Sequence, residues 1–214
     1  MPHPHHDGTQ KAWDTQFPSL GDSHVSRETL DRLRCYADLL LRWTKTISLV
    51  SKQDEALIWD RHIPDSIRLV PLLPRGLARA VDLGSGGGLP ALPLAIVSGV
   101  PFDLIESDRR KAAFLREAGR VTGAPVTVHC ERIEQSAVPP APLVTARALA
   151  PLPKLLGYAK PLLLEGGTCL FPKGASAQAE LAEARAAWSF SCQCHPMPPD
   201  PHSAVLAVRD LHHV

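Results

Sequence analysis

The first third of the chain carries apolar residues at helical spacing. After Ser26, a residue suited to cap a helix, the apolar positions are Leu30, Leu33, Ala37, Leu40 and Leu41. A second helix is expected to start at Asp54 and a third to follow Pro64. Residues 24–78 are therefore predicted to form a helical extension. Residues 1–23, with scattered Pro and Gly and little periodicity, are predicted to form a flexible leader.

From residue 79 onward, short apolar runs alternate with helical stretches. The predicted strands are 80–83, 102–105, 126–129, 143–146, 168–171, 188–194 and 203–209. The predicted helices between them are 89–98, 108–121, 150–163 and 175–187. This alternation is typical of a doubly wound, mostly parallel sheet with helices on both faces, and the last two strands are expected to form an antiparallel edge. The sequence predicts an α/β fold with a seven-stranded sheet.

A glycine-rich segment follows the first predicted strand and runs Asp82-Leu-Gly-Ser-Gly-Gly-Gly-Leu-Pro90. Glycines at the carboxyl end of a parallel strand let the backbone approach a ligand closely. Gly86, Gly88 and Ala91 fit the dinucleotide fingerprint, so a nicotinamide dehydrogenase is one interpretation. Two features disfavour it: Asp82 would repel a pyrophosphate, and Pro90 and Pro93 remove two amide donors from the first helical turn. A nucleoside triphosphate is disfavoured because no P-loop Lys follows.

An acidic residue after the second strand favours an adenosine-based cation. Glu106 closes that strand, where a carboxylate accepts hydrogen bonds from ribose hydroxyls. Together with the spacing Asp82-x-Gly84-x-Gly86-x-Gly88, it forms the pattern of Rossmann-like, class I S-adenosylmethionine-dependent methyltransferases. Residues 79–214 are therefore predicted to be an S-adenosylmethionine-binding domain.

The charge is small overall but unevenly distributed. The chain has 23 Lys and Arg against 22 Asp and Glu, a formal charge of +1, which does not indicate a general nucleic-acid binder. However, residues 24–79 hold ten basic and seven acidic residues, and residues 141–174 hold four basic residues and one acidic residue. A nucleic-acid substrate would therefore be held locally, by these two segments.

Other signals narrow the class of protein. No apolar run approaches the ~20 residues of a membrane span, and the N-terminus lacks the pattern of a signal peptide, so a cytoplasmic protein without a membrane partner is expected. Five scattered Cys do not indicate a disulfide framework. Cys192, Cys194 and His195 lack a second pair of ligands at finger-like spacing, so no metal site is expected.

Several separated motifs resemble the small-subunit ribosomal RNA methyltransferase G family, also called glucose-inhibited division protein B. These motifs are 82–95, Ile105-Glu106-Ser107 with Lys111 and Phe114-Leu115, Arg61-His62-Ile63-Pro64-Asp65-Ser66, Thr145-Ala146-Arg147-Ala148, and Lys173-Gly174. The resemblance covers roughly residues 26–209 and implies transfer of a methyl group from S-adenosylmethionine to guanine N7 in 16S rRNA, near the decoding site. It implies a partner that is 16S rRNA, a small ribosomal subunit or an assembly intermediate, and a monomeric enzyme is expected.

The resemblance also implies roles for individual residues. Asp82, Gly84, Gly86 and Leu89 would form the cofactor loop, Glu106 would hold the ribose, and Ile133 and Glu134 would flank the adenine. Arg147 would lie beside the cofactor and the incoming base, and Arg147 and Lys173 would hold phosphate or base. No general base is expected, because guanine N7 has a free lone pair.

Some features depart from the family or have simpler interpretations. Ala91 stands where the family usually has Gly, and the Pro-rich region 196–201 matches the family poorly. His62 and Asp65 are expected to tie the helical extension to the sheet rather than to contact RNA. Two other functions stay open: a small-molecule methyltransferase of the same fold, and a non-catalytic nucleotide-binding regulatory module.

Overall fold

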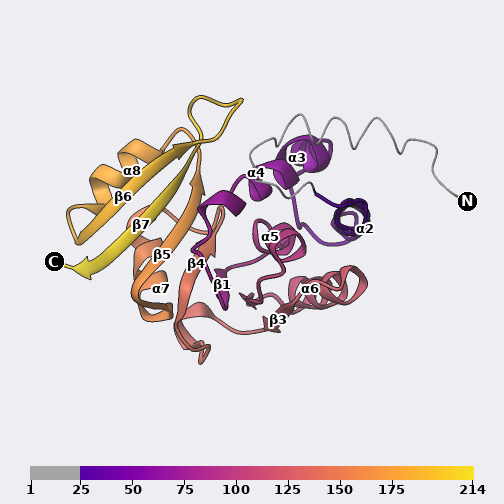
Figure 1. Ribbon diagram of the computed structural model, residues 1–214, viewed down its shortest axis with the longest axis horizontal. Helices are drawn as coiled ribbons and strands as arrows, with labels where there is room; N and C mark the ends of the chain where they lie inside the picture. Colours follow the sequence, from indigo (N-terminus) through magenta and orange to yellow (C-terminus); the bar gives the residue numbers. More distant parts are fainter. Residues whose placement is uncertain (1–24) are drawn as a thin grey trace, which may run out of the picture.

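The computed structural model describes residues 25–214, so the predicted leader 1–23 lies outside the described residues. The chain forms one seven-stranded sheet with helices on both faces, and the helical extension lies against one of these faces (Figure 1). Among residues 25–214, no helix is both long and apolar enough to cross a membrane.

The helical extension begins as predicted. Helix α2 spans Arg27–Thr44, and the Oγ of Ser26 accepts a hydrogen bond from the backbone N–H of Thr29 at 3.1 Å. Helix α4 spans Ile63–Ile67 and has Pro64 in its first turn, where a missing N–H is harmless. A 3₁₀ turn at Val70–Leu72 leads toward the sheet.

The predicted helix start at Asp54 is wrong. Helix α3 spans only Lys52–Glu55, and Ser51 is its cap: its Oγ accepts from the Asp54 N–H at 3.2 Å and donates to the Asp54 carboxylate at 2.6 Å. Asp54 therefore lies inside the helix, as the partner of the capping residue Ser51. The next stretch, Ile58–His62, is π-helical, a conformation that hydrophobic spacing does not reveal.

The sheet has the order β3-β2-β1-β4-β5-β7-β6. Its strands are β1 (Ala80–Leu83), β2 (Phe102–Ile105), β3 (Val126–His129), β4 (Ala141–Ala146), β5 (Leu163–Lys173), β6 (Trp188–Pro196) and β7 (Ala204–His213). The first five strands pair in parallel and the last two antiparallel, which confirms the predicted sheet and its edge. Strand β5 starts five residues before the predicted strand 168–171, because Gly166 and Gly167 lie within it and do not end it.

Two hydrophobic clusters cover the two faces of the sheet. The first joins α2, α4, α5 (Ala91–Ser98) and α6 (Arg109–Thr122) to residues of one face such as Leu104 and Leu170. The second joins α7 (Leu152–Ala159) and α8 (Ala177–Ala184) to residues of the other face such as Val81 and Val144. Figure 1 shows α5 and α6 on one side of the sheet and α7 and α8 on the other.

The helical extension shares the first cluster with the sheet. Helix α2 packs against α5 and α6, and α4 packs against α5. Arg32 donates to the backbone carbonyls of Thr122 and Gly123 at the end of α6, at 2.6 and 3.0 Å. The hydroxyl of Tyr36, which is fully buried, donates to the carbonyl of Gly87 at 2.6 Å. The division into 24–78 and 79–214 stays a prediction, but the two segments are joined by one core.

Candidate functional site

A cavity of about 520 Å³ opens at the carboxyl ends of the parallel strands. This volume is within the range of small-molecule and cofactor sites, and the ends of the strands are where open α/β sheets bind ligands. The residues predicted to bind a cofactor that line the cavity are Gly84, Gly86, Leu89, Glu106, Ile133, Glu134 and Arg147. The fold therefore brings together predicted residues from four separate segments of the chain.

The glycine loop after β1 is shaped by the absence of side chains. Gly84, Gly86 and Gly88 have φ angles of +60°, +52° and +85°, in the left-handed region that favours glycine. A Cβ on Gly84 would lie 2.5 Å from Cδ1 of Leu149, a residue that itself lines the cavity. The loop thus leaves room at the cavity wall that any other residue would fill.

Ala91, the departure from the family pattern, lies at the start of α5. Its side chain is fully buried in the cluster formed with the helical extension, and it does not line the cavity. The added methyl group is therefore accommodated by the core.

Glu106 lies just beyond β2 and ties two strand ends together. Its carboxylate accepts from the backbone N–H of Gly86 and of Asp108, both at 2.8 Å. The side chain is 8% exposed and faces the cavity. Each carboxylate oxygen has two lone pairs, so accepting one amide on each leaves capacity for hydroxyl donors of a ligand.

Asp82 lies inside the end of β1 and is 1% exposed, behind the cavity lining rather than in it. Its Oδ1 accepts from the hydroxyl of Thr145 on β4 at 2.5 Å. Its Oδ2 has no hydrogen-bond partner within residues 25–214. Burial raises the pKa of this carboxyl to about 7, and the nearby Glu106 carboxylate adds to the shift.

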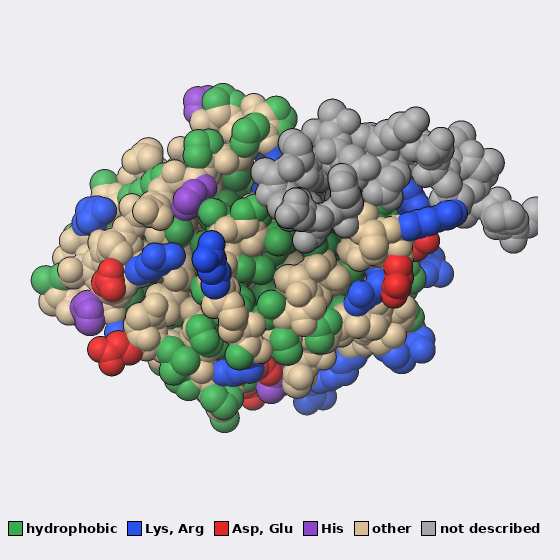
Figure 2. Space-filling view, viewed as in Figure 1, with side chains coloured by type: hydrophobic (Ala, Val, Ile, Leu, Met, Phe, Trp, Pro, Cys, Tyr) green, Lys and Arg blue, Asp and Glu red, His purple; other side chains and the backbone are tan. Residues whose placement is uncertain are grey.

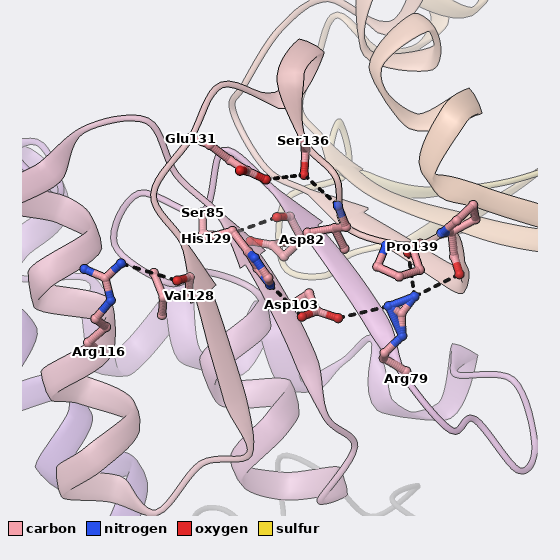
Figure 3. A network of polar contacts seen from close by, with 12 residues as sticks. Arg79, Asp82, Ser85, Asp103, Arg116, Val128, His129, Glu131, Ser136 and Pro139 are labelled. Carbon is pink, nitrogen blue, oxygen red and sulfur yellow. Dashed lines mark hydrogen bonds and ion pairs between the residues drawn. The ribbon is translucent and has the colours of Figure 1, made fainter.

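The segment between β3 and β4 forms the opposite wall, with Ile133 and Glu134 in a 3₁₀ turn at Ile133–Gln135. The hydroxyl of Ser136 donates to the Glu131 carboxylate at 2.6 Å, which links the two ends of this turn (Figure 3). Hydrogen bonds from its own backbone N–H and from Tyr158 hold the pKa of Glu134 below its usual range.

A neighbouring network anchors the strands that support this wall. Asp103 on β2 accepts from Arg79 at 3.0 Å and pairs with His129 at the end of β3 at 2.7 Å (Figure 3). Arg79 also donates to the backbone carbonyls of Pro139 and Pro140, which precede β4. This network therefore links β2, the end of β3 and the segment before β4.

Arg147 follows β4 and contacts the helical extension. Its guanidinium donates to Nδ1 of His62, and His62 Nε2 is 2.9 Å from Oδ1 of Asp54. Because Nδ1 accepts a hydrogen bond from Arg147, the neutral ring must carry its proton on Nε2, and this N–H donates a hydrogen bond to Asp54. Burial, with the charge of Arg147, lowers the pKa of His62, which favours this neutral form. The next residue, Ala148, has a φ of +52°, a strained conformation for a non-glycine residue.

The expectation that His62 ties the extension to the sheet is confirmed by this contact. Asp65 differs, because its ion pairs are with Arg68 at 2.8 Å and Arg61 at 3.8 Å, both within the extension. Sequence reasoning did not predict that Ser51, Asp54 and His62 would line the cavity. The only signal for them was the motif that contains His62, since their partner Arg147 lies 85 residues further along the chain.

A second, smaller cavity of about 120 Å³ lies next to the first. Arg147 lines both cavities, and Lys173, at the end of β5, lines only the smaller one. The ammonium group of Lys173 donates to the Ala150 carbonyl at 2.8 Å and to the Glu180 carboxylate at 2.7 Å. The two residues predicted to hold RNA thus lie on the same cavity, but Lys173 already has two protein acceptors.

The part of the chain that the structure describes contains no group of three His, Cys, Asp or Glu placed to hold a metal ion. Cys192 and Cys194 lie on β6, at the edge of the sheet, and burial raises the pKa of Cys192 to about 11.

Comparisons with solved structures support the fold. The chain resembles the ribosomal protein L11 methylase from Lactobacillus delbrueckii subsp. bulgaricus, with a TM-score of 0.57 and 14% identity over 69% of this chain and 77% of that one. It also resembles M. jannaschii TYW2 in complex with AdoMet, with a TM-score of 0.55 and 14% identity over 72% of this chain and 76% of that one. At this identity, the likeness establishes a class I methyltransferase fold.

Sequence comparisons are more specific. Residues 29–200 match the model of the GidB family, described as rRNA small subunit methyltransferase G. The chain is 55% identical to the ribosomal RNA small subunit methyltransferase G of Gluconobacter oxydans, over 89% of this chain and 98% of that protein. It is 51% identical to the protein of the same name from Paramagnetospirillum magneticum, over 90% of this chain and 94% of that protein. This chain therefore belongs to the rRNA small subunit methyltransferase G family.

Proposed function

We propose that this protein transfers the methyl group of S-adenosylmethionine to N7 of a guanine in 16S rRNA. The observation that carries the proposal is the cavity at the ends of the strands, with its glycine loop and Glu106, in a chain that belongs to this family. The proposal covers the reaction, the cofactor and the class of substrate.

The residues of the larger cavity fit the cofactor. A Cβ on Gly84 would collide with Leu149 at the cavity wall, and the Glu106 carboxylate lines the same cavity with free lone pairs for ribose hydroxyls. Leu89, Ile133 and Glu134 would surround the adenine, and Gly86 presents its backbone between them and Glu106. Asp82, although behind the lining, would supply negative charge beneath a cationic ligand once its carboxyl ionises. When bound, S-adenosylmethionine supplies an electrophilic methyl group on its sulfonium.

The protein's own part in the reaction is to position the base and to exclude water from the site. Guanine N7 has a lone pair and carries no proton, so no side chain has to remove one before attack. Orientation of the base and desolvation of the site then account for most of the acceleration. Arg147, at the boundary of both cavities, would orient the base or a phosphate, and Lys173 would contribute positive charge from the wall.

The distribution of charge supports an RNA partner. Lys and Arg side chains gather over the edge where α2 and α6 lie (Figure 2). The substrate would be 16S rRNA, as free RNA, in an assembly intermediate or in the small subunit. The proposal also includes that the protein is a monomer and acts in the cytoplasm.

The direct test is methyl transfer in vitro. Purified protein and labelled S-adenosylmethionine are incubated with small subunits, and separately with 16S rRNA, from a bacterial strain that lacks this enzyme. We expect one equivalent of label at one guanine, and mass spectrometry should assign it to N7. Label at another base or at an exocyclic amine would refute the proposal.

Calorimetry, combined with the transfer assay, separates the two alternative functions. Binding of S-adenosylmethionine by calorimetry, without any transfer to RNA or subunits, would favour a small-molecule methyltransferase. Binding of NAD(H) or a nucleotide, without binding of S-adenosylmethionine, would favour a nucleotide-binding regulatory module.

A further inference from the structure

The smaller cavity lies on the far side of Arg147 from the larger one. Its walls come from α4, from the end of β5 and from the segment between β6 and β7, and Figure 1 shows α4 beside the ends of β4 and β5. Its polar lining includes Arg61, Asp65, Ser66, Arg147 and Lys173.

The side chains around this cavity leave two guanidinium groups with spare donors. Lys173 and Ser66 donate to protein acceptors, Lys173 to Glu180 and Ser66 to the His62 carbonyl. Within residues 25–214, the hydrogen-bond acceptor of Arg147 is the neutral ring of His62, whereas Asp65 and Asp54 act on its charge only through space. Arg61 is 47% exposed and makes only long ion pairs, 3.8 Å to Asp65 and 3.9 Å to Asp200.

Asp65, the acidic residue in the lining, offsets only part of this charge. Its carboxylate is held by Arg68 at 2.8 Å, in addition to the long contact with Arg61. The cavity therefore has a positive lining, with two planar guanidinium groups that can each donate two parallel hydrogen bonds. This is the chemistry that recognises phosphate and carboxylate.

The reacting base itself does not suit this cavity. Methyl transfer requires the attacking atom to be about 3–3.5 Å from the methyl carbon. The side chain of Arg147 stands between the smaller cavity and the cavity that fits the cofactor. A group in the smaller cavity is therefore next to the reacting base along the RNA, and it must be anionic to match the lining.

Resting on the proposed function, we infer that the smaller cavity binds a backbone phosphate of the RNA beside the target guanine, through the guanidinium groups of Arg61 and Arg147. The ion pairs of Arg61 are long and partly exposed, so exchanging them for a phosphate costs little. His62 holds Arg147 toward the cavity from the opposite side. Substrate RNA would thus be registered by its backbone before the base reaches the methyl group.

The test is Arg61→Ala, with Arg75→Ala as the matched control. Arg75 is exposed in the loop before β1, at the opposite edge of the sheet. Methyl transfer to 16S rRNA or subunits and binding of the RNA are measured across a range of salt concentrations. For Arg61→Ala we expect KM for the RNA to rise about tenfold and the slope of log K against log[salt] to fall by about 1. S-adenosylmethionine affinity should not change, and Arg75→Ala should behave as wild type.

Arg61→Lys provides a second readout, because it keeps the charge and loses the planar fork. It should keep the wild-type salt slope, with a KM between those of wild type and Arg61→Ala. An Arg61→Ala enzyme with unchanged KM and salt slope would overturn the inference while the proposed function stands. The same holds if only kcat falls, since that result would assign Arg61 to the base. If the wild-type protein transfers no methyl group to RNA, the proposed function itself fails.

Discussion

A substitution at Gly84 can show whether the shape of the glycine loop determines cofactor binding. In Gly84→Ala the new Cβ would press on Leu149 and displace it into the cavity. We expect S-adenosylmethionine affinity, measured by calorimetry, to fall by about tenfold or more. The left-handed backbone adds a cost of about 1–2 kcal/mol in the free energy of unfolding.

Gly99 offers the matched control. It has a φ of +70° at the end of α5, and a Cβ there would meet nothing within 4 Å. Gly99→Ala should therefore lose the same stability and keep wild-type cofactor affinity. Equal affinity losses in both variants would mean that backbone strain, rather than filling of the cavity, explains the effect of Gly84→Ala.

His62 is a positioning residue for Arg147, and its role depends on a neutral ring. The charged groups that face the ring are Asp54, Asp65 and Arg147. Removing the acceptor in His62→Ala should lower kcat for methyl transfer about tenfold, the value of one hydrogen bond to a charged group. His62→Gln, whose amide oxygen can accept from Arg147, should recover part of the rate. Equal rates for both variants would exclude this role.

The same residue predicts the acidic limb of the pH profile. Because its pKa in the folded protein is below the ordinary value, the neutral ring persists below pH ~6.5. Protonation at still lower pH would place two cations against each other, so kcat should decline there. The stability that the neutral ring contributes is likewise present above its unfolded pKa and lost as the pH falls through the folded pKa. In His62→Gln this limb should disappear from the kcat profile.

For Asp82 we expect the opposite dependence of stability on pH, because burial raises its pKa to about 7. The folded protein favours the protonated carboxyl, so stability is highest below the unfolded pKa and declines as the pH rises to about 7. The decline is about 4 kcal/mol at most for a shift of this size. Asp82→Asn keeps the acceptor for Thr145 and removes the charge. Urea unfolding at pH 5 and pH 8 should show the variant gaining stability over wild type at pH 8; an equal difference at both values would contradict the shift.

At the scale of elements, α2 is connected to the cofactor loop by a single buried hydroxyl. Tyr36→Phe preserves the packing of the ring and leaves the Gly87 carbonyl without its 2.6 Å donor. We expect a loss of about 1–2 kcal/mol in the free energy of unfolding and a weaker S-adenosylmethionine complex. Ser26→Ala, at the start of the same helix, removes its cap and should cost about 1 kcal/mol with no change in cofactor affinity. If both variants bind the cofactor equally, α2 supports the fold alone.

The elements that sequence could predict are those whose pattern is local. The predicted strand 126–129 and helix 108–121 match β3 and α6 closely, since Asp108 caps α6 and Gly123 ends it. The start of α3 and the π-helical stretch Ile58–His62 could not be predicted, because a four-residue helix without buried residues shows no hydrophobic period and a π-helical turn shifts that period. The early start of β5 was hidden by Gly166 and Gly167, which lie where the pairing of β5 with β4 shifts register, and Gly166 has a φ of +70°.

In the candidate site too, the residues that sequence could predict are those with a local pattern. Residues in the glycine loop and at a strand end, such as Gly84 and Glu106, were predictable because a turn and a strand end are local features. The contact of His62 with Arg147 and the bond from Tyr36 to Gly87 join residues far apart in the chain. Such contacts depend on how the extension packs against the sheet, which no local pattern contains.

For the whole molecule, the question is whether the extension is a separate domain. Leu33 and Leu40 of α2 are fully buried, in one cluster with Phe114 of α6 and Leu104 of β2. Each fully buried Leu is worth about 1.5–3 kcal/mol, so these two alone contribute an amount comparable to the lower end of the roughly 5–15 kcal/mol stability of a typical domain. Losing the extension would also uncover one face of α5 and α6. Arg32 would also leave the carbonyls at the end of α6 without donors.

A fragment of residues 79–214 should therefore fail to fold as an independent unit. We expect it to aggregate, or to keep far-ultraviolet circular dichroism while losing cooperative thermal unfolding and S-adenosylmethionine binding. Mixing it with a fragment of residues 1–78 should restore some cooperative unfolding, because the two segments meet across an apolar interface that is complete only when both are present. A cooperative transition and wild-type cofactor affinity in 79–214 alone would show that the extension is a true domain. In that case its contacts with Gly87 and Arg147 would serve only the RNA substrate.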